Sequence, residues 1–109
     1  IGNKFLHAGP GYGGACFPKD TLALVRTAQD FDSPLKIIEA VVEVNKKRKL
    51  QMVSKIENAC GGSVRNKKVA VLGVTFKPNT DDMREAPSTR IIPKLIEFAN
   101  WFQIIRQRR

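Results

Sequence analysis

Residues 9–20 read Gly9-Pro10-Gly11-Tyr12-Gly13-Gly14-Ala15-Cys16-Phe17-Pro18-Lys19-Asp20. Four glycines within six positions give a backbone that can adopt positive φ and let another molecule approach it closely. Apolar residues follow at helical spacing, and Pro18 suits the first turn of a helix because its missing N–H costs nothing there. The pattern therefore predicts a helix over residues 18–29, with Cys16 at or just before its N-terminus.

Cys16 has more than one possible role at this position. The positive end of the helix and Lys19, about one turn away, would both stabilise a thiolate, which is the nucleophilic form of cysteine. Free cysteines are, however, among the most buried residue types in proteins. A glycine loop before a helix can also bind an anion without covalent chemistry. The spacing alone leaves a nucleophile, a buried thiol and an anion cradle open.

The composition limits the class of protein. The chain has 109 residues and 42% hydrophobic residues, which indicates one small folded domain or pieces of two. Its net charge of +9 favours anionic partners. Two distant cysteines and one histidine suit neither a disulfide framework nor a zinc site. Without a signal peptide or a membrane-spanning apolar run, we expect a reducing, cytoplasmic location, and the start at Ile1 suggests a piece of a longer protein.

A long helix is predicted from Pro34 to about Ala59, with Ser33 as its N-cap and Gly61-Gly62 as its stop. At ~1.5 Å per residue it would span ~39 Å, which is longer than a domain of this size can cover. We therefore expect it to bridge two domains or to pack against a second copy. The basic run at residues 45–49 is interpreted as a solvated face in preference to an anion-binding patch.

The second half of the chain reads as strand, loop and helix. Residues 69–76 form a nearly continuous apolar run, as expected for a strand buried on both faces of a parallel sheet. A helix is predicted from about Pro87, weakened by Pro93, and residues 101–105 could supply a second strand that ends before the arginine-rich residues 106–109. Ligands of such sheets bind at the carboxyl ends of strands, which points to the loop from Phe76 to Arg84.

Two of these motifs resemble the UDP-glucose 6-dehydrogenase family. Residues 11–20 resemble its active-site cysteine segment, residues 71–85 resemble the first strand and loop of its C-terminal domain, and the resemblance runs to about residue 97. It implies an α/β fold for the whole protein. This chain would then comprise the end of a catalytic domain (residues 1–33), a central inter-domain and dimer helix (residues 34–62) and the start of a Rossmann-like UDP-sugar-binding domain (residues 63–109).

The resemblance also implies an activity. Family members oxidise UDP-glucose to UDP-glucuronate, transferring two hydrides in turn to NAD. A cysteine thiolate holds the intermediate as a thiohemiacetal and then a thioester. The implied partners are UDP-glucose and a second copy through the central helix, with no metal, nucleic acid or membrane.

The family motifs assign roles to individual positions. Cys16 matches the nucleophile, Asp20 the acid associated with the hydrolytic water, and Lys19 a residue at the cofactor edge. The implied substrate-binding residues are Phe5, His7, Ala8, Gly9, Pro10, Gly11, Tyr12, Gly13, Phe76 and Lys77. The implied cofactor-binding residues are Cys16, Phe17, Pro18, Lys19 and Arg84.

The chain also departs from the family pattern. The glycine-rich dinucleotide-binding domain is not part of it, and the residues after Asn100 read as a truncated or shifted reading frame. We therefore expect the isolated chain to be inactive. The two alternatives are a small basic module that binds nucleic acid or a membrane surface, and a dimerisation remnant.

Overall fold

The structure, a computed structural model, describes residues 2–105. Within that range it contains three α-helices, one short 3-10 helix and a two-stranded parallel sheet, which confirms the expected α/β class. In chain order the elements are η1 (Asn3–Leu6), α1 (Phe17–Asp30), α2 (Lys36–Ala59), β1 (Lys68–Leu72), α3 (Ser88–Ile96) and β2 (Trp101–Ile105).

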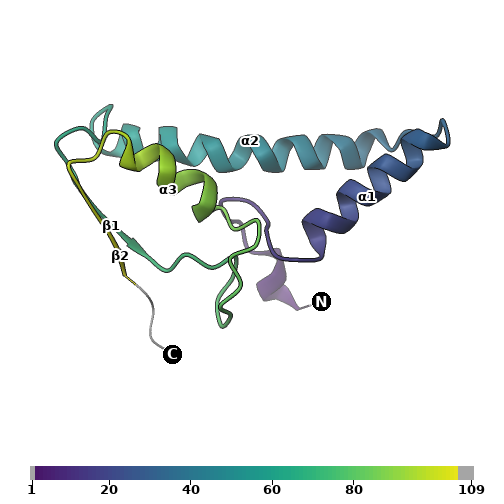
Figure 1. Cartoon of the computed structure of the whole chain (residues 1–109), viewed down its shortest axis with the longest axis horizontal. Helices are drawn as coiled ribbons and strands as arrows, with labels where there is room; N and C mark the ends of the chain where they lie inside the picture. The colour runs from purple at the N-terminus through teal and green to yellow at the C-terminus, as the bar shows by residue number, and fades with distance from the viewer. Residues whose placement is uncertain (1, 106–109) are drawn as a thin grey trace.

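Helix α2 is the scaffold on which the other elements are arranged (Figure 1). Its 24 residues span ~36 Å at ~1.5 Å per residue, in a molecule 51 Å long. Helix α1 packs against one end of α2 and α3 against the other. Two connecting segments meet beneath α2 between them: the cysteine loop (residues 7–16) and the strand-end loop (residues 73–87) (Figure 1).

Helix α1 forms where the sequence predicts it. Cys16 is the N-cap and Pro18 lies in the first turn, where a missing N–H leaves no hydrogen bond unmade. The helix ends when the Ser33 N–H donates to the Ala28 carbonyl oxygen at 2.9 Å, beside Asp32 with φ of 51°.

The start of α2 differs from the prediction. The first residue is Lys36 and the N-cap is Leu35, not Ser33. Leu35 has φ of −94° and ψ of 74°, outside the helical region, so Ser33 and Pro34 remain in the connection between the two helices. The predicted stop is confirmed, because Gly61 and Gly62 both have positive φ and donate to the carbonyls of Asn58 and Glu57.

The sheet consists of β1 and β2 in parallel, with Lys68 opposite Trp101 and Leu72 opposite Ile105. With α3 between them, these strands complete the βαβ unit that the sequence suggested, and α3 continues through Pro93 to Ile96. The expectation of a strand over residues 69–76 buried on both faces was wrong. Strand β1 ends at Leu72, its residues alternate between exposed and half-buried, and Gly73 with φ of 78° turns the chain away. The arginine-rich residues 106–109 lie outside the described residues.

The core of the described chain is small and lies where α3 approaches α2. It consists of Val64, Ala86 and Leu95. Large apolar side chains remain exposed elsewhere, including Phe31, Ile37 and Leu72 at 78–80%. No helix within residues 2–105 is long and apolar enough to cross a lipid bilayer.

Candidate active site

Cys16 is exposed at the N-terminus of α1, and its carbonyl oxygen accepts the Asp20 N–H at 2.8 Å in the first helical turn. The interpretation of Cys16 as a buried structural thiol is therefore wrong. A helix N-terminus stabilises negative charge on a nearby group. Cys60, the other free thiol, is half-buried at the C-cap of α2, where the helix end has the opposite polarity.

The structure brings the two sequence motifs together. The Gly14 N–H in the cysteine loop donates to the Arg84 carbonyl oxygen in the strand-end loop at 2.7 Å. The strand-end loop is itself closed by the Phe76 N–H, which donates to the Asp82 carbonyl oxygen at 3.1 Å. Residues nearly seventy positions apart therefore form one loop pair next to Cys16.

The glycines of the cysteine loop are required mainly by this packing. A Cβ on Gly13 would lie 2.5 Å from the Glu85 carbonyl oxygen, and a Cβ on Gly14 would lie 2.9 Å from the Phe76 ring. The expectation that the glycines admit another molecule is thus corrected at these positions, where the chain itself makes the close approach. A Cβ on Gly9 would meet nothing within 4 Å.

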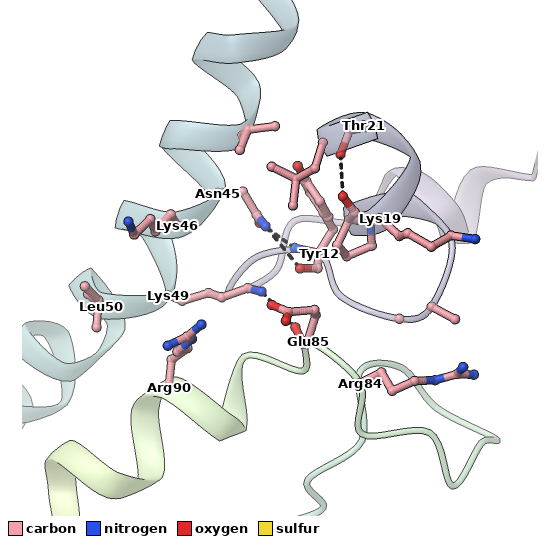
Figure 2. Close-up of a pocket in the computed structure, with 15 residues that line it drawn as sticks. Tyr12, Lys19, Thr21, Asn45, Lys46, Lys49, Leu50, Arg84, Glu85 and Arg90 are labelled. Atoms are coloured by element: carbon pink, nitrogen blue, oxygen red, sulfur yellow. Dashed lines mark hydrogen bonds between the residues drawn. The ribbon is translucent and has the colours of Figure 1, made fainter. Parts of the chain in front are cut away.

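Two polar residues of α2 hold the loop pair (Figure 2). The Asn45 Oδ1 accepts the Tyr12 N–H at 2.8 Å, and its Nδ2 donates to the Tyr12 carbonyl oxygen at 3.2 Å. One turn later, the Lys49 Nζ donates to the Glu85 carbonyl oxygen at 2.7 Å. Lys49 is only 5% exposed. Burial lowers its pKa; Glu85 opposes this shift and Arg90 adds to it.

The interpretation of residues 45–49 as a solvated face was wrong for Asn45 and Lys49, although residues 46–48 are exposed as expected. A signal for this was present in the sequence. The more buried positions of α2 recur at alternating spacings of four and three, and the stripe passes through both polar residues: Ile38, Val42, Asn45, Lys49, Met52 and Ile56. A polar residue within an apolar stripe needs a specific partner.

Arg84 and Asp82 shape the tip of the strand-end loop. The Arg84 Nε and Nη2 donate to the two carboxylate oxygens of Asp82 at 3.0 and 2.8 Å. Hydrogen bonds from Arg84 hold the pKa of the Asp82 carboxyl below its usual value. Asp82 in turn raises the pKa of Arg84, and the charge of Cys16 contributes in the same direction. The Arg84 backbone lies beside the cysteine loop, because its carbonyl oxygen accepts the Gly14 N–H two residues before Cys16.

The other predicted side chains lie around this centre. Lys19 forms an exposed ion pair with Asp20 at 3.4 Å. The Lys77 Nζ lies 5.3 Å from the centre of the Phe76 ring. The rings of Tyr12 and Phe17 meet edge to face at 5.0 Å.

A cavity of about 770 Å³ lies between α1, α2 and the loop pair. Four of the predicted site residues line it: Tyr12, Pro18, Lys19 and Arg84. Cys16, Asp20 and the predicted substrate residues Phe5, His7, Ala8, Gly9, Pro10, Gly11, Gly13, Phe76 and Lys77 do not. Phe5 and residues 7–10 are exposed. The cavity thus brings residues of the cysteine loop and the strand-end loop together, but it includes none of the predicted substrate residues before Tyr12.

Comparisons with known proteins match the two halves of this site. Residues 1–47 match the central domain of the UDP-glucose/GDP-mannose dehydrogenase family, and residues 70–104 match the UDP binding domain of the same family. The chain is 61% identical over 95 residues to the UDP-glucose 6-dehydrogenase of Rhizobium meliloti, which covers 87% of this chain and 22% of that protein. It is 52% identical over 95 residues to the UDP-glucose 6-dehydrogenase TuaD of Bacillus subtilis, covering 87% and 20%.

The solved UDP-glucose dehydrogenase from Pyrobaculum islandicum has the same arrangement, with a TM-score of 0.83 at 39% identity over 97% of this chain and 24% of that one. The chain spans about a fifth of the length of the curated relatives it matches. Since two domain models of one family match in chain order and these relatives agree with them, the chain belongs to the UDP-glucose/GDP-mannose dehydrogenase family.

Proposed function

We propose that this chain is part of an NAD-dependent UDP-glucose 6-dehydrogenase, in which Cys16 is the nucleophile. The observation that carries the proposal is the exposed Cys16 at the N-terminus of α1, with the strand-end loop hydrogen-bonded to the loop before it. The relatives named UDP-glucose 6-dehydrogenase support the choice of substrate. These comparisons do not favour a basic nucleic-acid- or membrane-binding module, or a dimerisation remnant.

The chemistry assigned to Cys16 proceeds in two oxidations at one carbon. Loss of a proton and a hydride converts the C6 alcohol to an aldehyde, and the Cys16 sulfur adds to its carbon to give a thiohemiacetal. Loss of a second hydride from that carbon, together with the proton of its hydroxyl group, gives a thioester. Water associated with Asp20 then attacks the thioester, releasing the carboxylate and regenerating the thiol.

NAD, when bound, accepts the two hydrides. The residues around Cys16 fit a phosphate-bearing cofactor because Lys19 and Arg84 are exposed cations on facing segments. The guanidinium of Arg84 has five N–H donors and uses two of them on Asp82, which leaves others for a phosphate. We assign cofactor binding to Cys16, Phe17, Pro18, Lys19 and Arg84.

The nucleotide sugar is assigned to Phe5, to the segment from His7 to Gly13, and to Phe76 and Lys77. The exposed residues 7–10 are free to contact a ligand along their backbone. At Tyr12, both backbone groups are bonded to Asn45. Its ring is therefore the part of Tyr12 that the proposal uses.

The domain division proposed is residues 1–33, 34–62 and 63–109. We propose a homodimer through α2 because its apolar residues Ile37, Val41 and Val44 are exposed. A cytoplasmic location is proposed because both cysteines are free thiols. The isolated 109-residue chain is expected to be inactive, since the site it carries includes no dinucleotide-binding domain within the described residues.

A graft tests the function. The 95 matched residues would replace their counterparts in the Rhizobium meliloti UDP-glucose 6-dehydrogenase, and NADH formation from UDP-glucose would be followed by absorbance. We expect turnover by the graft, no turnover after Cys16→Ser, and retained turnover after the control Cys60→Ser. A folded graft that is inactive, or that still makes UDP-glucuronate after Cys16→Ser, would contradict the proposal. NADH formation by the isolated chain would refute its expected inactivity.

A further inference from the structure

We propose that Asn45 and Lys49 are positioning residues, which align the cysteine loop that carries Cys16 with the strand-end loop that carries Arg84. This inference rests on the proposed function, because it assigns a purpose to the alignment of Cys16. Neither residue touches the reacting groups. They lie one turn apart on α2 and act through the two loops (Figure 2).

Asn45 fixes the cysteine loop four residues before Cys16. Its amide satisfies both the N–H and the carbonyl of Tyr12, so the peptide plane on each side of this residue is held. The neighbouring backbone sits directly on α2, because a Cβ on Gly11 would lie 2.9 Å from the Asn45 Oδ1 and 3.0 Å from the Lys49 Cγ. A two-point attachment of this kind sets the height and the rotation of the loop.

Lys49 fixes the strand-end loop at the residue after Arg84. Its ammonium donates to the Glu85 carbonyl oxygen, while the adjacent Arg84 carbonyl oxygen accepts the Gly14 N–H. Three hydrogen bonds thus connect α2 to the cysteine loop, the cysteine loop to the strand-end loop, and the strand-end loop back to α2. Loss of the Lys49 hydrogen bond would detach from α2 the strand-end loop that carries Arg84.

The burial of Lys49 indicates that this residue does more than stabilise the fold. It is the one buried charged side chain among residues 2–105. Burying a charge is costly, and well-packed apolar replacements of buried charges are often neutral or stabilising. Arg90 on α3 adds like charge nearby, and Glu85 offsets it. A geometrical role for the ammonium explains why a lysine occupies an otherwise apolar stripe.

The first experiment measures the alkylation rate of Cys16 by iodoacetamide in the full 109-residue chain, read by peptide mass spectrometry with Cys60 as the internal reference. Arg84→Gln is expected to slow alkylation of Cys16 by about 1.5- to 5-fold, the range for an exposed pair of charges. Lys49→Met keeps the apolar stem and removes the donor, and is expected to slow the reaction by a similar factor. Lys49→Arg should restore the rate.

The double variant distinguishes positioning from a general loss of stability. If Lys49 acts by placing Arg84, then Arg84→Gln causes no further slowing in the Lys49→Met background, while the Cys60 rate and the helical circular dichroism stay unchanged. Lys46→Met is the matched control: Lys46 is exposed, belongs to the same helix, and has no bonded partner within residues 2–105. Full and additive effects of Arg84→Gln in the Lys49→Met chain would overturn the proposal.

Hydrogen exchange of the unmodified chain provides a test that does not depend on any variant folding. The amides of Tyr12 and Gly14 should exchange more slowly than those of Ala8 and Gly9 in the same loop, because only the first pair donates to a fixed acceptor. Equal exchange at all four amides would refute the alignment, even if Lys49→Met unfolds. Neither the alkylation experiment nor the hydrogen-exchange experiment uses nucleotide or sugar. An inactive graft would therefore contradict the proposed function without changing the alkylation or exchange rates.

Discussion

Replacing Gly13 by alanine should force the two loops apart. The added Cβ would lie 2.5 Å from the Glu85 carbonyl oxygen, 2.9 Å from its carbonyl carbon and 3.1 Å from the Phe76 Cβ. These neighbours are backbone atoms and the root of a side chain, so none can move by a simple rotation. Gly13 does not have a positive φ, which means that the effect comes from contact and not from backbone strain.

The size of the effect follows from the distances. Ordinary van der Waals contact begins at 3.4 Å, so relieving the closest contact requires a separation of about 0.9 Å. That shift also lengthens the 2.7 Å hydrogen bond between the Gly14 N–H and the Arg84 carbonyl oxygen. Overpacking of a close-packed site costs about 1–3 kcal/mol. We expect the free energy of unfolding to fall by this amount.

Gly9→Ala is the matched control for this substitution. A Cβ on Gly9 meets no atom within 4 Å, and alanine reduces the conformational freedom of the unfolded chain, which stabilises by about 0.4–1 kcal/mol. Urea unfolding of both variants, followed by circular dichroism, would measure the difference. Equal midpoints for Gly13→Ala and Gly9→Ala would show that the loops do not pack as described.

Two further predictions concern the core and the strand-end loop. Leu95→Ala should lower the free energy of unfolding by about 2–5 kcal/mol, because Leu95 is 2% exposed. Ile96→Ala should lower it much less, because Ile96 is 52% exposed. Similar losses for both variants in urea unfolding would contradict the assigned core. Asp82 has a lowered pKa, so its contribution to stability is present above its usual value of 3.8 and is lost as the pH falls through the lowered value. An NMR titration of the Asp82 carboxyl carbon should therefore have its midpoint below 3.8, and a midpoint at or above that value would show that Arg84 does not hold the carboxylate.

The helices were predictable because their signals are local. Pro18 after Cys16 marks the start of α1, and Gly61-Gly62 marks the end of α2, through backbone effects that need no tertiary contact. Helix α2 begins two residues later than the sequence predicts, because Leu35 does not have helical φ and ψ. Burial of β1 could not be predicted from its composition, because burial depends on which elements cover each face.

The chemistry of the site was predicted in part. The sequence placed Cys16 at a helix N-terminus and the Phe76–Arg84 loop at a strand end, and the structure brings these two segments together. It did not show that α2 connects them. Asn45 and Lys49 lie in a basic run that usually indicates a solvated face, and their role depends on partners 33 and 36 residues away in the chain.

The loop pair is held by hydrogen bonds and close backbone contacts, and not by the small apolar core. Val64, Ala86 and Leu95 form the core of residues 2–105, and none of them belongs to the cysteine loop. That loop is positioned by hydrogen bonds and by glycine contacts, which are directional and short-ranged. Helix α2 thus carries both anchoring side chains, Asn45 and Lys49, and its apolar residues Ile37, Val41 and Val44 are exposed.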